Sequence, residues 1–166
     1  MIALVRVDNR LLHGQVLEAW LPRLSAGSVV VADDDAARSP LARAAMTLAL
    51  PDEMPAAVVP VAEVRWESLA ASPERVLVLM RQVADLERAA AQGLTPERAH
   101  TLNVGNVHYA AGRRPITSSV YLSGEEVEAL ERLAARGFAV ELRAVPGEPP
   151  LGLDEIERRY KSAPQG

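Results

Sequence analysis

The sequence contains no cysteine, which excludes disulfides, thiolate metal sites, iron–sulfur clusters and a cysteine nucleophile. Lysine is nearly absent as well, because all but one of the 18 basic residues are arginines. The single lysine, Lys161, lies in the polar C-terminal tail. The chain therefore offers no candidate for a P-loop lysine or a Schiff-base lysine, and covalent chemistry must use another side chain.

Basic charge is scarce relative to acidic charge, since 22 acidic and 18 basic residues give a net charge of −4 at pH 7. Nucleic-acid binding calls for a basic face, so nucleic acid is not an expected partner. Long apolar runs are absent too, and the N-terminal segment leads into Asp8 and Arg10 without a signal-peptide cleavage pattern. We therefore expect a cytoplasmic protein.

Apolar runs alternate with helical patterns along the 166 residues. Strands are expected at residues 2–7, 28–32, 57–61, 75–80, 101–104, 116–122 and 138–145, and helices at 14–24, 40–50, 62–71, 83–91 and 125–136. This order predicts an α/β fold, a single-domain doubly wound, mostly parallel sheet of about seven strands with helices on both faces. The domain is expected to span residues 1–147, and residues 148–166 are expected to form a C-terminal tail with a short helix at 154–160.

Ligands of such sheets bind beyond the carboxyl ends of the strands. The loop after the first strand, residues 8–15, holds an acid, an arginine and a histidine, followed by a glycine at the start of a helix. A helix N-terminus favours an anion, an arginine fork can hold phosphate oxygens, and a neutral imidazole can attack phosphorus. The loop is therefore a candidate phosphohistidine site. Its candidate residues are His13 and Arg10 for catalysis, and Asp8, Gly14 and Gln15 for binding.

The alternative for this loop is structural: His13 caps the first helix while Arg10 pairs with Asp8. Two further residues fall at the same predicted edge. Asp34 follows the second strand and either orients His13 or Arg10 or belongs to a solvated acidic turn. His108 follows the fifth strand, after an expected turn at residues 105–106, and either approaches the phosphoryl group or is structural. No metal site is predicted.

Residues 6–16, RVDNRLLHGQV, together with Trp20 resemble the signature R-I-D-D-R-L-I-H-G-Q-V…W. This signature is that of the IIB subunits of the mannose/fructose/sorbose family of the bacterial sugar phosphotransferase system. Residues 31–41, VADDDAARSPL, are similar to the family's V-V-N-D-E-V-A-K-D-P-L. The segments LNVGN at 102–106, GFAV at 137–140 and VP at 145–146 are similar to its N-V-G-G and its G-V-x-V…V-P close, so the resemblance covers residues 1–147.

The resemblance implies that His13 accepts a phosphoryl group on Nδ1 from the phosphohistidine of a IIA domain. It passes the group to sugar arriving through the membrane subunits IIC and IID, with the protein peripheral to the inner membrane. The family needs no cofactor or metal and often forms homo-oligomers. The chain departs from the family at Asn9, which replaces the usual second aspartate of the loop, and at Asp33, where asparagine is common.

Two other functions fit the same fold. A regulatory or signalling protein would be phosphorylated at His13 without taking part in sugar transport, and the presence or absence of neighbouring IIC and IID genes would separate the two. A receiver-like domain would need a lysine after the fifth strand. That reading fails because the only lysine is Lys161.

Overall fold

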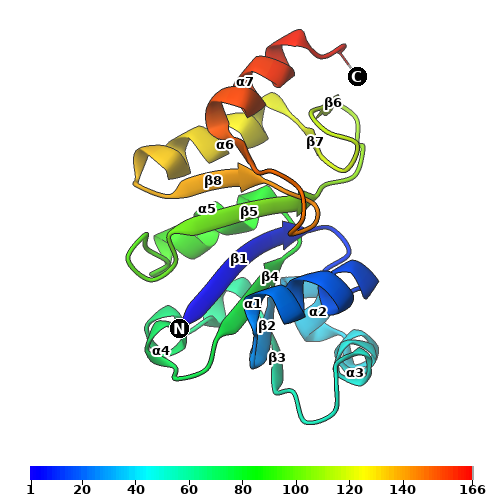
Figure 1. Cartoon of the computed structure of the whole chain (residues 1–166), viewed down its shortest axis with the longest axis vertical. Coiled ribbons are helices and arrows are strands. Elements are labelled where there is room, and N and C mark those ends of the chain that lie inside the picture. Colours follow the sequence, from blue (N-terminus) through cyan, green and yellow to red (C-terminus); the bar gives the residue numbers. More distant parts are fainter. Residues whose placement is uncertain (166) are drawn as a thin grey trace.

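The computed structural model describes residues 1–165, and its centre is a seven-stranded sheet of order β3-β2-β4-β1-β5-β8-β9 (Figure 1). The first six strands in this order are parallel, and β9 runs antiparallel to β8. The strands are β1 (Ile2–Asp8), β2 (Ser28–Ala32), β3 (Ala56–Val59), β4 (Val76–Met80), β5 (Thr101–Asn106), β8 (Ala139–Leu142) and β9 (Leu151–Gly152). This confirms the predicted α/β fold.

Helices cover both faces of the sheet. A π-helical turn η1 (Val16–Trp20), α1 (Leu21–Leu24), α2 (Asp34–Arg38) and α3 (Pro40–Ala49) pack on one face. A 3-10 turn η2 (Val61–Glu63), α4 (Trp66–Ala71), α5 (Val83–Ala91), α6 (Gly124–Ala135) and α7 (Leu153–Ser162) pack on the other. Successive strand residues therefore enter different cores: Leu77 and Leu79 face α1, whereas Val78 and Met80 face α5.

The predicted strand at residues 116–122 is wrong. Only two residues of this segment form a strand, β7 (Tyr121–Leu122), which pairs with β6 (Arg114–Pro115) outside the main sheet. The cause is Thr117, whose Oγ1 accepts hydrogen bonds from the N–H groups of Ser119 (3.2 Å) and Val120 (3.0 Å). This local turn competes with the extended chain that the apolar alternation suggested.

The seventh strand of the sheet is instead β9, in the segment that was expected as a tail. The helix expected at 154–160 lies within α7, which packs beside α6 (Figure 1). Ile156 of α7 is fully buried, and the Arg114 guanidinium lies 4.5 Å from the centre of the Tyr160 ring. Residues 151–162 thus pack on the same core as the strands before them.

The carboxyl ends of β1, β2, β4 and β5 all lie at one edge of the sheet because these strands are parallel. β1 is central there, with β4 on one side and β5 on the other (Figure 1). Among residues 1–165, no helix has the length and apolar character needed to cross a membrane.

Candidate functional site

The site begins with a buried arginine in the middle of β1. The Arg6 side chain is fully buried, and four hydrogen bonds hold its guanidinium. Nη1 donates to Asn103 Oδ1 (2.6 Å) and to the Arg143 carbonyl (2.8 Å). Nη2 donates to Asp8 Oδ2 (3.1 Å) and to the Ala144 carbonyl (2.9 Å). Burial lowers the pKa of Arg6, and the neighbouring Asp8 carboxylate opposes that shift.

Trp20 and Gly105 shape the space that the Arg6 guanidinium occupies. The guanidinium carbon lies 5.0 Å from the centre of the Trp20 ring, and Trp20 Nε1 donates to the Ala144 carbonyl (2.9 Å). A Cβ added to Gly105 would lie 1.9 Å from the same guanidinium carbon. Residues 105–106 are the last two of β5 and not the expected turn, and the missing side chain of Gly105 provides room for Arg6.

Arg6 in turn holds Asp8 at the carboxyl end of β1. The Asp8 side chain is fully buried, and its Oδ2 atom contacts both Arg6 Nη2 and the Nε2 atom of His13, the latter at 2.8 Å. Since a carboxylate only accepts hydrogen bonds, we assign the ring proton of a neutral His13 to Nε2. The Nδ1 atom of His13 then carries the free lone pair, on a side chain that is 13% exposed.

The predicted loop residues Asp8, Arg10 and His13 are therefore brought together by the fold. Asp8 Oδ1 accepts the backbone N–H of Arg10 (3.0 Å), and the Leu11 N–H donates to the Asp8 carbonyl (2.9 Å), which closes a turn. Leu11 is buried in the left-handed region, with φ 54°. At the tip of this turn, the exposed Arg10 guanidinium makes no hydrogen bond or ion pair with residues 1–165.

The structural alternative for this loop is not observed. Asp8 binds the Arg10 backbone and not its guanidinium, and the His13 side chain bonds Asp8 instead of capping the helix. Gly14 and Gln15 form the exposed first turn of the helix, where a Cβ added to Gly14 would meet nothing within 4 Å. The first N–H groups of a helix have no partner within it, so this turn can receive an anion.

Asp34 lies at the same edge of the sheet but faces other groups. Its Oδ1 accepts the Val61 N–H (2.9 Å) and its Oδ2 pairs with Arg88 (2.8 Å). The Val61 hydrogen bond and then Arg88 lower the pKa of Asp34. Asp34 forms no hydrogen bond or ion pair with His13 or Arg10 within residues 1–165.

The preceding residue, Asp33, connects to the loop of residues 8–15 through Arg81. Asp33 caps α2 by accepting the Ala36 N–H (2.9 Å), and it binds the Arg81 guanidinium through both oxygens, at 3.1 and 3.0 Å. This pairing raises the pKa of Arg81. Arg81 Nη1 also donates to the Asn9 carbonyl (3.2 Å).

Sequence reasoning missed the support behind Asp8, which is formed by Arg6 together with Asn103, Gly105 and Trp20, and it missed the contact of Arg81 with Asn9. One signal was available, since an arginine inside a strand of otherwise apolar residues needs a buried partner. His108 contributes its backbone to this edge: its N–H donates to Asn9 Oδ1 (2.6 Å), while the residue itself is exposed. Within residues 1–165, no cluster of three or more histidine, aspartate or glutamate side chains could hold a metal.

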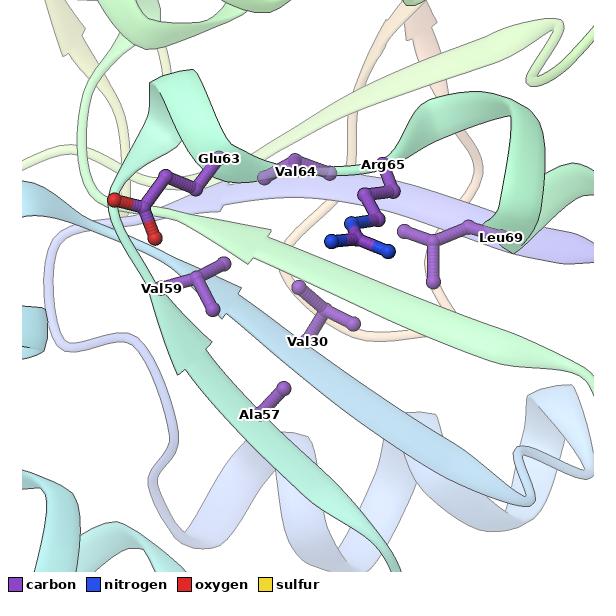
Figure 2. A pocket seen from close by; sticks show the side chains of 7 residues that line it. All are labelled: Val30, Ala57, Val59, Glu63, Val64, Arg65 and Leu69. Atoms are coloured by element: carbon purple, nitrogen blue, oxygen red, sulfur yellow. The ribbon is translucent and has the colours of Figure 1, made fainter.

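A hollow of about 220 Å³ lies apart from this loop, at the β3 edge of the sheet (Figure 2). Val30, Ala57 and Val59 point into it from the strands, and Arg65 and Leu69 close it from the other side (Figure 2). None of the candidate residues lines this hollow, and its walls are mainly apolar. The hollow is therefore not part of the candidate site at His13.

Comparisons with known proteins identify the class of protein to which this chain belongs. A family model described as "PTS system sorbose subfamily IIB component" matches residues 2–163. The chain is therefore a component of the phosphotransferase-system class. More narrowly, it belongs to the sorbose subfamily of IIB components.

Individual relatives agree with this family. The chain is 30% identical over 164 residues to the N-acetylgalactosamine-specific phosphotransferase enzyme IIB component 2 of Escherichia coli K12, covering 93% of this chain and 98% of the relative. It is 28% identical over 158 residues to the sorbose-specific EIIB component of Klebsiella pneumoniae, covering 93% and 94%. The mannose-specific EIIAB component of E. coli K12 is 28% identical over 94% of this chain, which spans only 48% of that relative, about half its length.

Solved structures show the same fold. The IIBSor domain of the sorbose permease from K. pneumoniae superposes with a TM-score of 0.81 at 28% identity, covering 95% of this chain and 97% of that one. The manxB protein from Thermoanaerobacter tengcongensis gives a TM-score of 0.82 at 27% identity, with 96% of each chain covered.

Proposed function

We propose that this chain is a phosphocarrier that receives a phosphoryl group on Nδ1 of His13 and passes it on. The observation that carries the proposal is the contact of 2.8 Å between His13 Nε2 and the buried Asp8 carboxylate. It holds the ring by one nitrogen and leaves the other as a nucleophile. Membership of the IIB family supports this assignment.

In the proposed reaction the donor is the phosphohistidine of a IIA domain. The Nδ1 lone pair of His13 forms a bond to phosphorus while the bond between phosphorus and the donor nitrogen breaks, and the donor imidazole leaves. In the second step a sugar hydroxyl oxygen, delivered through IIC and IID membrane subunits, attacks phosphorus. The His13–phosphorus bond then breaks, the neutral His13 imidazole leaves, and the hydroxyl proton passes to water.

Each group around His13 has a physical task in this transfer. A ring phosphorylated on Nδ1 gains positive charge, which the Asp8 carboxylate at Nε2 stabilises. The Arg10 guanidinium, which is unpaired within residues 1–165, and the N–H groups at Gly14 and Gln15 are available for the phosphoryl oxygens, whose charge is spread in the transition state. Asp34, already bound to Val61 and Arg88, has a secondary role at most in this proposal.

The family also supports a place of action. IIB components work with IIA and with IIC and IID partners, so we propose that this chain acts in the cytoplasm, at the inner face of the membrane. The regulatory alternative is not favoured, because the relatives matched are named as components of sugar-specific phosphotransferase systems.

The test is incubation with a phosphorylated IIA domain, followed by intact-mass and peptide-mapping mass spectrometry. We expect one phosphoryl group, acid-labile and base-stable, on His13. His13→Ala should abolish labelling, while His100→Ala and His108→Ala, which change the other two histidines, should not. Labelling that persists in His13→Ala would contradict the proposal.

A further inference from the structure

Asn9 uses its backbone and its side chain to join the loop of His13 to two other loops. The Asn9 N–H donates to the Asn106 carbonyl (2.9 Å), and Oδ1 accepts the His108 N–H (2.6 Å). On the opposite side, Nδ2 donates to the Arg81 carbonyl (2.7 Å), and Arg81 Nη1 donates to the Asn9 carbonyl (3.2 Å). We call these four hydrogen bonds the Asn9 clasp.

The clasp joins the loops of the strands that flank β1. Arg81 follows β4, while Asn106 ends β5 and His108 lies just beyond it; β4 and β5 are the two neighbours of β1 in the sheet. Arg81 also binds Asp33, which follows β2, so the connection runs across the ends of four parallel strands. The clasp thereby connects the loops at the carboxyl edge of the sheet to one another.

Two of the four bonds of the clasp require an amide side chain. Oδ1 acts as an acceptor toward His108 and Nδ2 acts as a donor toward Arg81, and only asparagine offers both groups at this reach. An aspartate, the residue typical of this position in the family signature, could keep the first bond. It would set a carboxylate oxygen against the Arg81 carbonyl in place of the second. The neutral amide also adds no anion beside Asp8, close to the site proposed for the phosphoryl group.

The clasp is linked to His13 through Asp8, the residue before Asn9. Asn9 lies between Asp8 and Arg10 in the turn that the Leu11 N–H closes on the Asp8 carbonyl. The Asp8 carboxylate that receives His13 Nε2 also accepts the Arg10 N–H, so the orientation of the carboxylate depends on where this turn lies. Moving Asn9 therefore moves the group that holds the imidazole and the backbone that carries the Arg10 guanidinium.

We propose that Asn9 is a positioning residue for phosphoryl transfer, which rests on the function proposed above for His13. Its amide fixes the turn at residues 8–11 between the loops after β4 and β5, and this holds Asp8 against His13 Nε2. Displacement of a reacting group by about 1 Å costs on the order of 100-fold in rate. Loss of the side-chain bonds of the clasp should therefore slow the transfer step more than it weakens binding of the donor.

The experiment compares Asn9→Asp and Asn9→Ala with the wild-type chain. Gln92→Glu is the matched control, since it makes the same change from amide to carboxylate at an exposed position at the far end of α5. Phosphoryl uptake from a phosphorylated IIA domain is measured over a range of donor concentrations, at a temperature where all variants are folded by circular dichroism. In parallel, ¹⁵N NMR of the unphosphorylated proteins reports the tautomer of the His13 ring without any donor.

We expect both Asn9 variants to lower the maximal rate about tenfold or more, with the half-saturating donor concentration changed by less than about twofold. We also expect the His13 signals to move from one Nε2–H tautomer toward a mixture, while Gln92→Glu matches the wild type in both measurements. Wild-type rates or unchanged His13 signals in both Asn9 variants would overturn the proposal. Changed signals together with no uptake by the wild-type chain would instead reject the phosphocarrier function and leave Asn9 as the residue that orients His13.

Discussion

Replacing Gly105 by alanine tests whether the buried Arg6 side chain needs the space that a residue without a side chain leaves at position 105. Gly105 has an ordinary backbone conformation, unlike Gly93, Gly112 and Gly137, whose φ angles are positive. Alanine can therefore adopt the backbone of residue 105 without strain. The obstacle is the Arg6 guanidinium, because the added Cβ would lie between 1.9 and 2.1 Å from three of its atoms.

The size of the effect follows from the hydrogen bonds that must shift. The guanidinium makes four, two through each Nη atom, and a shift large enough to clear the added Cβ cannot keep them all. Hydrogen bonds to a charged group contribute about 1.5–3 kcal/mol each, so losing two costs about 3–6 kcal/mol. For a domain of this size that corresponds to a fall in Tm of roughly 6–24 °C.

Thermal and urea unfolding followed by circular dichroism measure this directly. Gly147→Ala is the control, because a Cβ added there meets nothing within 4 Å. In an Arg6→Lys background, where the planar fork is absent, Gly105→Ala should cost less than about 1 kcal/mol, which makes the two changes strongly non-additive. A single Gly105→Ala variant within about 1 kcal/mol of the wild type, or additive effects, would refute the reasoning.

Two further predictions concern the cations and acids at the same edge. Arg10→Lys should slow phosphoryl uptake by His13, and Arg10→Ala should slow it on the order of 100-fold. The free energy of unfolding should not change in either variant, because the guanidinium has no partner within residues 1–165. Equal uptake rates in all three proteins would assign Arg10 no part in transfer. The pKa of Asp34 is held below its ordinary 3.8 by the Val61 N–H and by Arg88, so its contribution to stability is present above that value and is lost as pH falls through the lower folded pKa. In urea titrations, the stability advantage of the wild type over Asp34→Asn should therefore shrink below about pH 4, and a constant difference down to about pH 2 would contradict this sign.

Most of the fold could be predicted because its signals are local. Residues 83–91 form α5 as expected, since both the apolar spacing and the glycine that follows are encoded within a few positions. Segment 116–122 misled because the Thr117 hydroxyl offers hydrogen bonds that an apolar pattern does not register. Gly105 misled for the opposite reason: a glycine near a strand end suggests a turn, whereas here it provides room for a side chain from another strand.

The candidate site divides along the same line. Asp8, Arg10 and His13 lie within six consecutive positions, so one loop brought them to attention. The groups that hold Arg6 are remote, with Asn103 separated from it by 97 positions and Arg143 by 137, and no local pattern records such pairs. Topology supplies the link, because β5 lies beside β1 and β8 lies beside β5.

The burial of Arg6 is unfavourable for folding stability, which indicates that the residue has another role. Among the residues that the structure describes, its buried Nε atom has no hydrogen-bond partner. A buried ion pair often contributes less to stability than apolar side chains of the same volume would. Stability alone therefore does not explain a guanidinium that Gly105, Asn103 and two carbonyls must accommodate. What Arg6 provides is an Asp8 carboxylate held in place with one oxygen directed at His13 Nε2. Arg6 thus lies behind the imidazole, where holding one ring nitrogen leaves the other free to act as the nucleophile in the proposed transfer.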